Sequence, residues 1–262
     1  MIGAGIDAGS RSLKVVVFDT APPRILAACL TDQGVAQERL ATETFARALS
    51  QAQIARWQLA GVVATGYGRN AIRFADTTIT EITCHARGVH HLAPQTRTIL
   101  EIGGQDSKVI SLEAGGRVRD FAMNDRCAAG TGRFLEMVAL RLGADLAALG
   151  ELSRASQKPA LISSMCVVFA ETEIIGLLAA GTPAPDIVAG VQQAIATRVS
   201  ALAGRNTAPP ICFTGGVALQ SGMVRALEEV LVCPIHVVPQ PQFTGALGAA
   251  ILATRTRRSA EL

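Results

Sequence analysis

Three short glycine-containing turns, each following an apolar strand, are the feature that most constrains this chain. The strands are expected at residues 2–7, 98–102 and 211–214, and the turns at residues 7–10, 103–106 and 214–217. After each of the first two turns the chain returns as another apolar strand, which predicts two hairpins with polar tips. The hairpins are about 95 residues apart, a spacing within the size range of one lobe. This recurrence predicts two related α/β lobes, with a cleft between them that both hairpin tips face.

The remaining pattern completes the expected domain organisation. Apolar residues at helical spacing predict helices at 37–59, 81–92, 134–142, 170–180, 185–203, 224–231 and 245–254. Further strands are expected at 61–65, 117–123 and 235–238. We expect a first lobe made of residues 1–94 and 243–262, and a second lobe made of residues 95–242.

Composition excludes several other classes of protein. Of the 262 residues, 49% are apolar and 17% are charged, which rules out an intrinsically disordered chain. The apolar segments are shorter than the roughly 20 residues that cross a bilayer, and no secretory signal pattern precedes them. The formal net charge is only +3 and the basic residues are scattered, unlike a nucleic-acid-binding surface. We therefore expect a cytoplasmic protein that binds neither membrane nor nucleic acid.

The glycine turns suit the phosphates of a nucleotide. Glycine allows close approach of the backbone, and successive N–H groups form a nest for phosphate oxygens. Lys14 is placed to counter phosphate charge, and Asp7 and Asp106 are candidates to hold Mg²⁺ through water. Gln105 or Asp106 is a candidate catalytic residue that orients an attacking water. Neither the Walker nor the dinucleotide glycine pattern is present, and each turn alone is better explained as an ordinary hairpin. The three together, in this order, favour a nucleotide site.

The predicted nucleotide-binding set extends beyond the first two turns. Its members are Asp7, Gly9, Ser10, Ser12, Lys14, Gly103, Gly104, Gly130, Thr131, Gly132, Gly215 and Gly216.

Two of the six cysteines stand at or just before the starts of predicted helices. A helix N-terminus stabilises a thiolate, and it equally suits an anionic iron–sulfur cluster, so Cys127 and Cys166 are the candidate metal ligands. A cubane cluster normally requires four thiolates, and two copies of this chain supply four. A cluster shared between two subunits is the economical hypothesis, while two unrelated buried cysteines remain the alternative.

The other four cysteines have structural explanations. Cys29, Cys212 and Cys233 lie in apolar, strand-like contexts that are typical of a small buried side chain. Cys84 lies close to three histidines. The spacing of His85 and His90 is poor for one helical face and no CxxC motif accompanies them, so a structural role is favoured over a metal site.

Seven segments of the chain form a combined pattern, namely residues 5–10, 64–70, 102–106, 124–134, 166–171, 214–218 and 245–249. Together they resemble a known family, the BadF/BadG/BcrA/BcrD-type ATPases. This family includes the activators of 2-hydroxyacyl-CoA dehydratases and the ATPase subunits of benzoyl-CoA reductases. The segments keep their order and spacing over nearly the whole chain, and the two cysteine segments are the most specific of them.

The resemblance implies a fold and a function. The fold would be the α/β, two-lobed actin-like ATPase of the acetate and sugar kinase, chaperone and actin superfamily, with a nucleotide cleft between the lobes. Two subunits, identical or homologous, would share one 4Fe–4S cluster through Cys127 and Cys166 of each. ATP with Mg²⁺ would drive an electron from ferredoxin or flavodoxin to an acyl-CoA dehydratase or benzoyl-CoA reductase component.

One position departs from the family pattern. Members of this family have Asp before the second glycine turn, whereas this chain has Glu101. The additional methylene moves the carboxylate, so Glu101 is left out of the predicted site.

Two other functions of the same fold compete with this interpretation. A small-molecule kinase, for a sugar or an acid, needs a general base, for which Asp106 or Asp125 is a candidate. A kinase mechanism assigns no function to the two cysteines at the starts of helices. A non-catalytic assembly module of actin type would form nucleotide-dependent filaments and would tolerate loss of Cys127.

Overall fold

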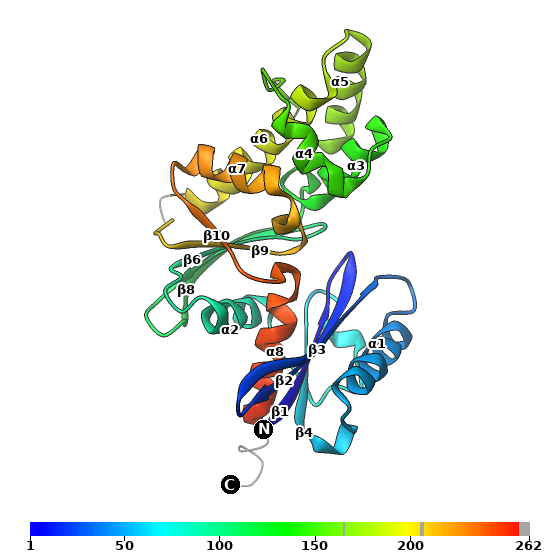
Figure 1. The fold of residues 1–262 in the computed structure, drawn as a ribbon, viewed down its shortest axis with the longest axis vertical. Helices are drawn as coiled ribbons and strands as arrows, with labels where there is room; N and C mark the ends of the chain where they lie inside the picture. The colour runs from blue at the N-terminus through cyan, green and yellow to red at the C-terminus, as the bar shows by residue number, and fades with distance from the viewer. Residues whose placement is uncertain (165, 205–206, 257–262) are drawn as a thin grey trace. The chain divides into compact units, whose positions relative to one another are not determined.

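The computed structural model describes residues 1–164, 166–204 and 207–256. The chain divides into two compact units (Figure 1). Unit 1 contains Met1–Thr96, Leu112–Arg119 and the chain from Phe243 onward, and unit 2 contains Arg97–Ser111 and Asp120–Gln242. The segment 112–119, expected in the second lobe, groups with unit 1. Its turn packs there against α2 (Glu81–Leu92), where a Cβ on Gly116 would lie 2.6 Å from the Cβ of His90.

Unit 1 contains a five-stranded sheet in the order β3-β2-β1-β4-β5. Its strands are β1 (Ile2–Ala8), β2 (Ser12–Thr20), β3 (Pro23–Asp32), β4 (Leu59–Thr65) and β5 (Thr77–Thr78). The first hairpin is confirmed, because β1 and β2 pair antiparallel, whereas β1 and β4 run parallel.

The sheet of unit 2 has the order β10-β9-β6-β7-β8. Its strands are β6 (Thr98–Ile102), β7 (Ser107–Leu112), β8 (Val118–Asn124), β9 (Ile211–Thr214) and β10 (Ile235–Val237). Read from β8, the order of this sheet is the same as that of unit 1 read from β3. Both sheets also pair their central strand antiparallel with the hairpin strand and parallel with the next strand. The two glycine hairpins therefore occupy equivalent places in two related sheets.

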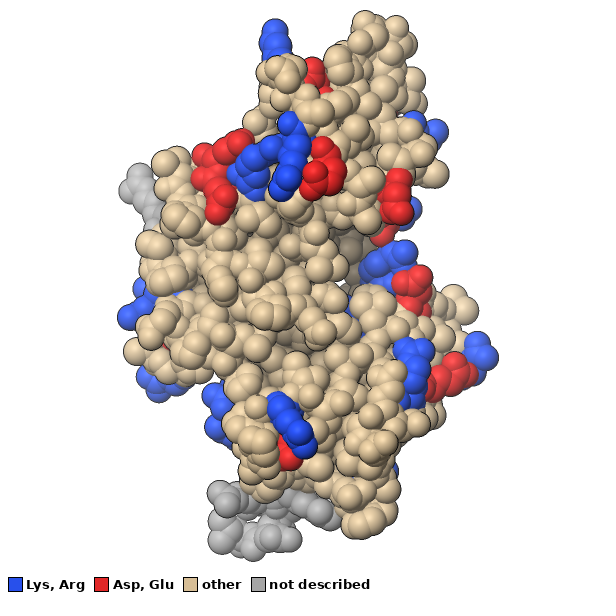
Figure 2. All heavy atoms as spheres, viewed as in Figure 1, with Lys and Arg blue, Asp and Glu red and all other residues tan. Residues whose placement is uncertain are grey.

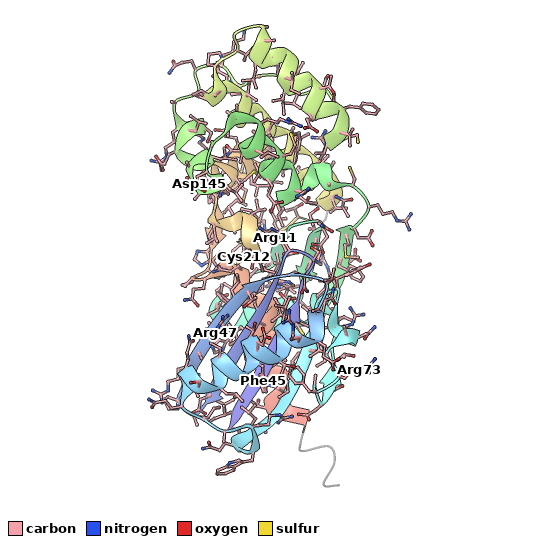
Figure 3. All side chains as sticks on the ribbon, turned by 90° about the vertical axis from the view of Figure 1, so that its right-hand side faces the viewer. Arg11, Phe45, Arg47, Arg73, Asp145 and Cys212 are labelled. Carbon is pink, nitrogen blue, oxygen red and sulfur yellow. The ribbon has the colours of Figure 1, made fainter. Side chains whose placement is uncertain are left out.

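Helices cover both faces of the unit 1 sheet. These helices are α1 (Gln37–Ala52), α2 and α8 (Thr244–Thr256). Because side chains alternate along a strand, β2 directs Val15 and Val17 toward the core that contains Phe45 of α1. It directs Val16 and Phe18 toward the core of α8. Figure 3 shows α1 lying across the strands, with Phe45 and Arg47 labelled on it.

A close helix crossing explains part of the glycine and alanine content of α8. A Cβ on Gly248 would overlap the carbonyl oxygen of Cys84 in α2, so these two helices touch through their backbones. Any larger residue at position 248 would push them apart.

The helices of unit 2 form one core with its sheet. They are α3 (Gly132–Leu142), α4 (Leu149–Arg154), α5 (Val167–Ala179), α6 (Ala184–Ala203) and α7 (Ser221–Leu231). Phe134 of α3, Val191 of α6 and Leu227 of α7 lie in the same buried cluster as Phe213 of β9. Single 3-10 turns connect several elements, including Ala128–Gly130 and Gly216–Leu219.

The expected helix at 37–59 was too long. In the structure α1 ends at Ala52, because Gln53 adopts a left-handed conformation with φ 56°. The N–H of Gln53 donates to the carbonyl oxygens of Leu49 and Ser50. Leu59 begins β4 instead, so its apolar side chain belongs to a strand and not to the helix.

Candidate nucleotide and cysteine sites

The first glycine hairpin holds an acid and a lysine together at the end of β1. Asp7 and Lys14 are register partners on β1 and β2, and the Lys14 Nζ lies 3.4 Å from Asp7 Oδ2. Asp7 is only 6% exposed. Gly66, directly after β4, has φ +87°, and a Cβ there would overlap Asp7 Oδ1. The carboxylate therefore lies under a backbone that only glycine can form.

The second hairpin repeats this arrangement with different residues. Glu101 and Lys108 are register partners on β6 and β7, and Lys108 Nζ donates to Glu101 Oε2 at 2.8 Å. Gly215, directly after β9, has φ +91°, and a Cβ there would lie 2.6 Å from Glu101 Oε1. Lys108, 1% exposed, also donates to Asp106 Oδ2. A buried lysine thus joins Glu101 to the predicted catalytic acid.

The two hairpins also match in the sequence positions of their acid, lysine, threonine and glycine. In each hairpin the acid and the lysine are seven residues apart. Thr65 is the parallel partner of Asp7 and Thr214 is that of Glu101, and the glycine follows each threonine. Glu101 is therefore the structural counterpart of Asp7, and the longer side chain still reaches the place beneath its glycine. Lys108 was missed by sequence reasoning, although the repeated acid–lysine spacing was a signal for it.

Several predicted nucleotide-binding residues of unit 2 converge. The N–H of Gly132 donates to the Gly103 carbonyl at 2.9 Å, and Thr131 Oγ1 donates to the Gly104 carbonyl at 3.1 Å. A Cβ on Gly132 would lie 3.1 Å from Val217 Cγ2, in the turn that contains Gly216. The second hairpin, the start of α3 and the turn after β9 thus meet at one place.

The remaining predicted residues are accessible at the hairpins. Gln105 is exposed, and Asp106, Gly9, Ser10 and Ser12 are half-buried. Nothing lies within 4 Å of the place that a Cβ on Gly216 would occupy. These positions leave room for a ligand, and their roles in nucleotide binding stay predictions.

Gly215 offers a test of this geometry. We expect Gly215→Ala to destabilise the protein by about 2–4 kcal/mol, because alanine would have to adopt a left-handed conformation against Glu101 and the Ile102 carbonyl. Gly216→Ala is the matched control, since its Cβ enters open space. Urea unfolding of both variants measures the difference. Equal stability of the two variants would contradict the close packing at position 215.

Cys127 and Cys166 are exposed, whereas Cys29, Cys84 and Cys212 are buried. Cys166 is the N-cap residue of α5, as predicted. Cys127 instead precedes the 3-10 turn Ala128–Gly130, and α3 begins only at Gly132. Exposure excludes the alternative that both are buried structural residues.

Side-chain hydrogen bonds hold the backbone around each exposed cysteine. Asn124 Nδ2 donates to the Cys127 carbonyl at 2.7 Å, and the Cys127 N–H donates to Asn124 Oδ1 at 3.0 Å. Glu173 accepts from the N–H groups of Ser163 and Ser164, at 2.8 and 2.9 Å, just before Cys166. Partial burial would raise the pKa of Glu173, but hydrogen bonds from Ser164 and Ser163 outweigh it and lower the pKa to about 2. Sequence reasoning missed both contacts, which depend on the folded loops.

Cys84, the cysteine beside the histidines, is buried in the core of unit 1. Burial raises the pKa of Cys84 to about 12, and likewise that of Cys212. His85 Nδ1 lies 3.0 Å from Thr244 Oγ1, and the His91 ring packs edge-on against Phe18. Within the described residues, no three His, Cys, Asp or Glu side chains are grouped so that they could hold a metal ion.

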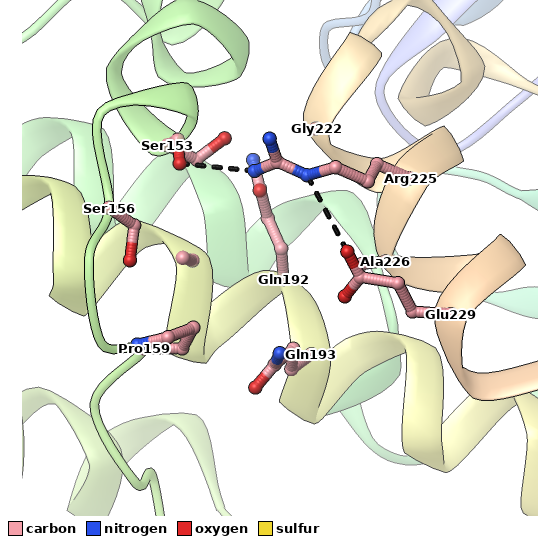
Figure 4. A pocket seen from close by; sticks show the side chains of 10 residues that line it. Ser153, Ser156, Pro159, Gln192, Gln193, Gly222, Arg225, Ala226 and Glu229 are labelled. Atoms are coloured by element: carbon pink, nitrogen blue, oxygen red, sulfur yellow. Dashed lines mark hydrogen bonds and ion pairs between the residues drawn. The ribbon is translucent and has the colours of Figure 1, made fainter.

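A polar hollow of about 200 Å³ lies between α4, α6 and α7 (Figure 4). Ser153, Gln192 and Arg225 line it, and Arg225 Nη2 donates to the Ser153 carbonyl at 3.0 Å. None of the predicted nucleotide-site residues line this hollow.

Two observations concern nucleic acid and membranes, the distribution of surface charge and the length and hydropathy of the helices. On the face shown in Figure 2, Lys and Arg are interspersed with Asp and Glu. None of the described helices is both long enough and apolar enough to span a bilayer.

Similarity to known proteins covers almost the whole chain. The model of the BadF/BadG/BcrA/BcrD ATPase family matches residues 4–253. The 2-hydroxyisocaproyl-CoA dehydratase activator of Clostridioides difficile is 42% identical over 254 residues, which cover 97% of this chain and 95% of that protein. A subunit of the benzoyl-CoA reductase of Thauera aromatica is 31% identical over 261 residues, which cover 95% of this chain and 92% of that protein.

Solved structures agree with these relatives. The activator of the 2-hydroxyisocaproyl-CoA dehydratase from Clostridium difficile with bound ADPNP has a TM-score of 0.93 and 41% identity, covering 100% of this chain and 97% of that one. The ethanolamine utilization protein EutJ from Carboxydothermus hydrogenoformans has a TM-score of 0.64 at 15% identity, covering 96% of this chain and 90% of that one, which shows the fold alone. The chain therefore belongs to the BadF/BadG/BcrA/BcrD ATPase family and has the two-lobed α/β fold of actin-like ATPases.

Proposed function

We propose that this protein is an ATP-hydrolysing iron–sulfur protein that passes low-potential electrons from ferredoxin or flavodoxin to an acyl-CoA dehydratase or benzoyl-CoA reductase component. The observation that carries the proposal is the exposure of Cys127 and Cys166 in the unit that also holds the second glycine hairpin. The names of the relatives, which are dehydratase activators and a component of a benzoyl-CoA reductase, support it.

The donor set fits a cluster that is shared between two subunits. One chain offers two exposed thiols, and its described residues provide no further grouped ligands. A 4Fe–4S cluster takes about four thiolates, so a second identical or homologous subunit supplies the other two. When bound, such a cluster would supply one-electron transfer. Its reduction potential would depend on hydrogen bonds to its sulfur atoms, on net charge and on solvent exposure.

Exposed apolar side chains beside Cys166 favour the second subunit. Val168 and Phe169, in the first turn of α5, are 68% and 71% exposed, and Ile175 is 48% exposed. Apolar side chains of this size are usually covered when they gather next to one another. A subunit that binds the same cluster would cover them.

The glycine hairpins would bind ATP. Their N–H groups would face phosphate oxygens, and Lys14 would counter part of the charge while it remains close to Asp7. Asp7 and Asp106 would hold Mg²⁺ through water, and Gln105 or Asp106 would orient the attacking water. Lys108 would keep the Asp106 carboxylate in place.

The second hairpin has a direct connection to a cysteine segment. Gly103 and Gly104 accept hydrogen bonds from Gly132 and Thr131, which follow Cys127 by only a few residues. A nucleotide that binds better to one arrangement of this hairpin would therefore favour one arrangement of the Cys127 turn. This contact is the route by which ATP hydrolysis would alter the surroundings of the cluster.

Replacing Asp106 tests the hydrolytic part of the proposal. We expect Asp106→Asn to slow ATP hydrolysis about 100-fold, because the amide neither accepts a proton nor attracts Mg²⁺ as a carboxylate does. The iron content should stay unchanged, and activation of a dehydratase component should fall with hydrolysis. Phosphate release and iron analysis, both under anaerobic conditions, measure the two effects.

Asp145→Asn is the control for this substitution. Asp145 accepts from the Ala147 N–H at the start of a 3-10 turn, and asparagine caps such a turn equally well. Unchanged hydrolysis in Asp106→Asn would remove Asp106 from the catalytic set. Phosphorylation of a sugar or an acid by the wild-type protein would favour the kinase instead.

A further inference from the structure

Both cysteine segments lie near one residue of α6, Arg198. Arg198 Nη2 donates to the Ser164 carbonyl at 2.7 Å, two residues before Cys166. The stem of the same side chain lies beside Gly130, where an added Cβ would be 3.8 Å from Arg198 Cβ. Gly130 ends the 3-10 turn that follows Cys127. Arg198 thus binds the loop before one thiol, and its Cβ lies near the turn that follows the other.

Arg198 is itself held in place. Its Nη1 donates to the Ala194 carbonyl at 2.8 Å, one turn earlier on α6, and the residue is half-buried. The neighbouring residues Ile195 and Val199 are buried in the core of unit 2. With Nη1 bound to Ala194, the guanidinium directs Nη2 toward the Ser164 carbonyl. Because the guanidinium is planar, fixing one of its nitrogens also fixes the direction of the other.

The contacts on the two loops complement one another. Ser164 donates its N–H to Glu173 and accepts from Arg198, so both of its backbone polar groups are satisfied. The side-chain amide of Asn124 hydrogen-bonds to both the N–H and the carbonyl group of Cys127. A Cβ added to Gly130 would lie 3.3 Å from Asn124 Nδ2. Asn124 and Glu173 each hold one loop, whereas Arg198 binds the Ser164 loop and also lies beside the turn after Cys127.

We propose that Arg198 is a positioning residue that fixes the placement of the Cys127 and Cys166 segments relative to each other, and thereby determines how firmly a shared cluster is held. The inference rests on the proposed function, because it assumes that both thiols bind one cluster. Groups that orient metal ligands without binding the metal typically contribute about 10- to 100-fold to metal affinity. Arg198 would act less directly, through the backbone of Ser164, two residues before Cys166, and from beside the turn after Cys127.

Iron release from the anaerobically prepared protein tests the proposal. Wild type, Arg198→Gln and Arg198→Lys are mixed with an excess of an iron chelator, and the rate of cluster loss is followed by absorbance. We expect cluster loss about 10- to 100-fold faster in Arg198→Gln and an intermediate rate in Arg198→Lys, which keeps the charge but lacks the fork. The EPR spectrum of the reduced cluster should broaden in Arg198→Gln, a change that lower stability alone would not produce.

Arg225→Gln is the matched control. Arg225 also donates to a backbone carbonyl of unit 2, that of Ser153, but it contacts neither cysteine segment in the described structure. Its release rate should equal that of wild type. If Arg198→Gln fails to fold, as judged by circular dichroism, Arg198→Lys carries the test through its faster release.

The outcomes separate this inference from the proposed function. A wild-type cluster combined with unchanged release rates and EPR spectra in the Arg198 variants overturns the positioning role alone. A wild-type protein that takes up no cluster overturns both proposals.

Discussion

Replacing Cys127 or Cys166 with serine is expected to remove the iron–sulfur cluster and to leave a monomer that still binds ATP. Among the described residues, Cys127 and Cys166 are the two exposed cysteines, so the loss of one leaves the pair of chains with two ligands instead of about four. The hairpins proposed to bind ATP do not include either cysteine, and their acid–lysine pairs should stay intact. Iron analysis, molar mass from light scattering and ATP titration measure the three properties on one anaerobic preparation.

Cys233→Ser is the control for these variants. Cys233 is also in unit 2 and partly exposed, but it lies between α7 and β10, and its Sγ lies 3.6 Å from the Pro234 carbonyl. We expect this variant to keep its iron and its dimer. A full complement of iron in Cys127→Ser or Cys166→Ser would contradict the assignment of the ligands. An assembly module of actin type would likewise be unaffected by these substitutions.

Replacing Lys108 with methionine is expected to destabilise the protein by about 3–5 kcal/mol. Lys108 and Glu101 are 1% and 5% exposed, and the substitution leaves the Glu101 carboxylate buried without its cation. Asp106 loses the same partner, so ATP hydrolysis should fall as well. Urea unfolding and phosphate release measure the two losses.

Two further variants make the explanation specific. Lys158→Met changes the same residue type at an exposed position and should alter stability by less than about 0.5 kcal/mol. Adding Glu101→Gln to Lys108→Met should restore part of the lost stability, because the buried charge is then removed. A Lys108→Met protein as stable as Lys158→Met would show that the buried pair contributes nothing.

The shared geometry of the two hairpins clarifies what the departure at position 101 means. Asp7 and Glu101 each pair with a lysine from the neighbouring strand and lie under a glycine with positive φ. The longer carboxylate of Glu101 is thus part of a buried ion pair that also holds Asp106. Glu101 and Lys108 are buried, whereas Asp106 is half-buried and more accessible.

The sequence located most elements because their signals are local. Apolar runs beside glycine turns identified β1, β6 and β9, and helical spacing identified α2 at the bounds it has in the structure. The strand β3 was not predicted, since Pro23, Arg24 and Leu30 are exposed and blur the apolar pattern. The end of α1 was misplaced because Gln53 stops the helix through its backbone conformation.

Contacts between distant segments could not be inferred from local patterns. The pairing of Lys108 with Glu101 depends on the register of β6 and β7, and that of Arg198 with Ser164 depends on how α6 packs. The helix-start context of Cys166 was correct, whereas Cys127 precedes a single 3-10 turn. Exposure of both thiols, which separates them from the buried cysteines, became visible only in the folded chain.

The central claim is that one cluster is held jointly by two chains, and metal analysis of the dimer tests it most directly. The protein is purified without oxygen, its molar mass is measured by light scattering, and iron and acid-labile sulfide are determined in the same fractions. The account predicts a brown dimer with about four iron and four sulfide per two chains. A colourless monomer, or about four iron bound to each separate chain, would contradict it.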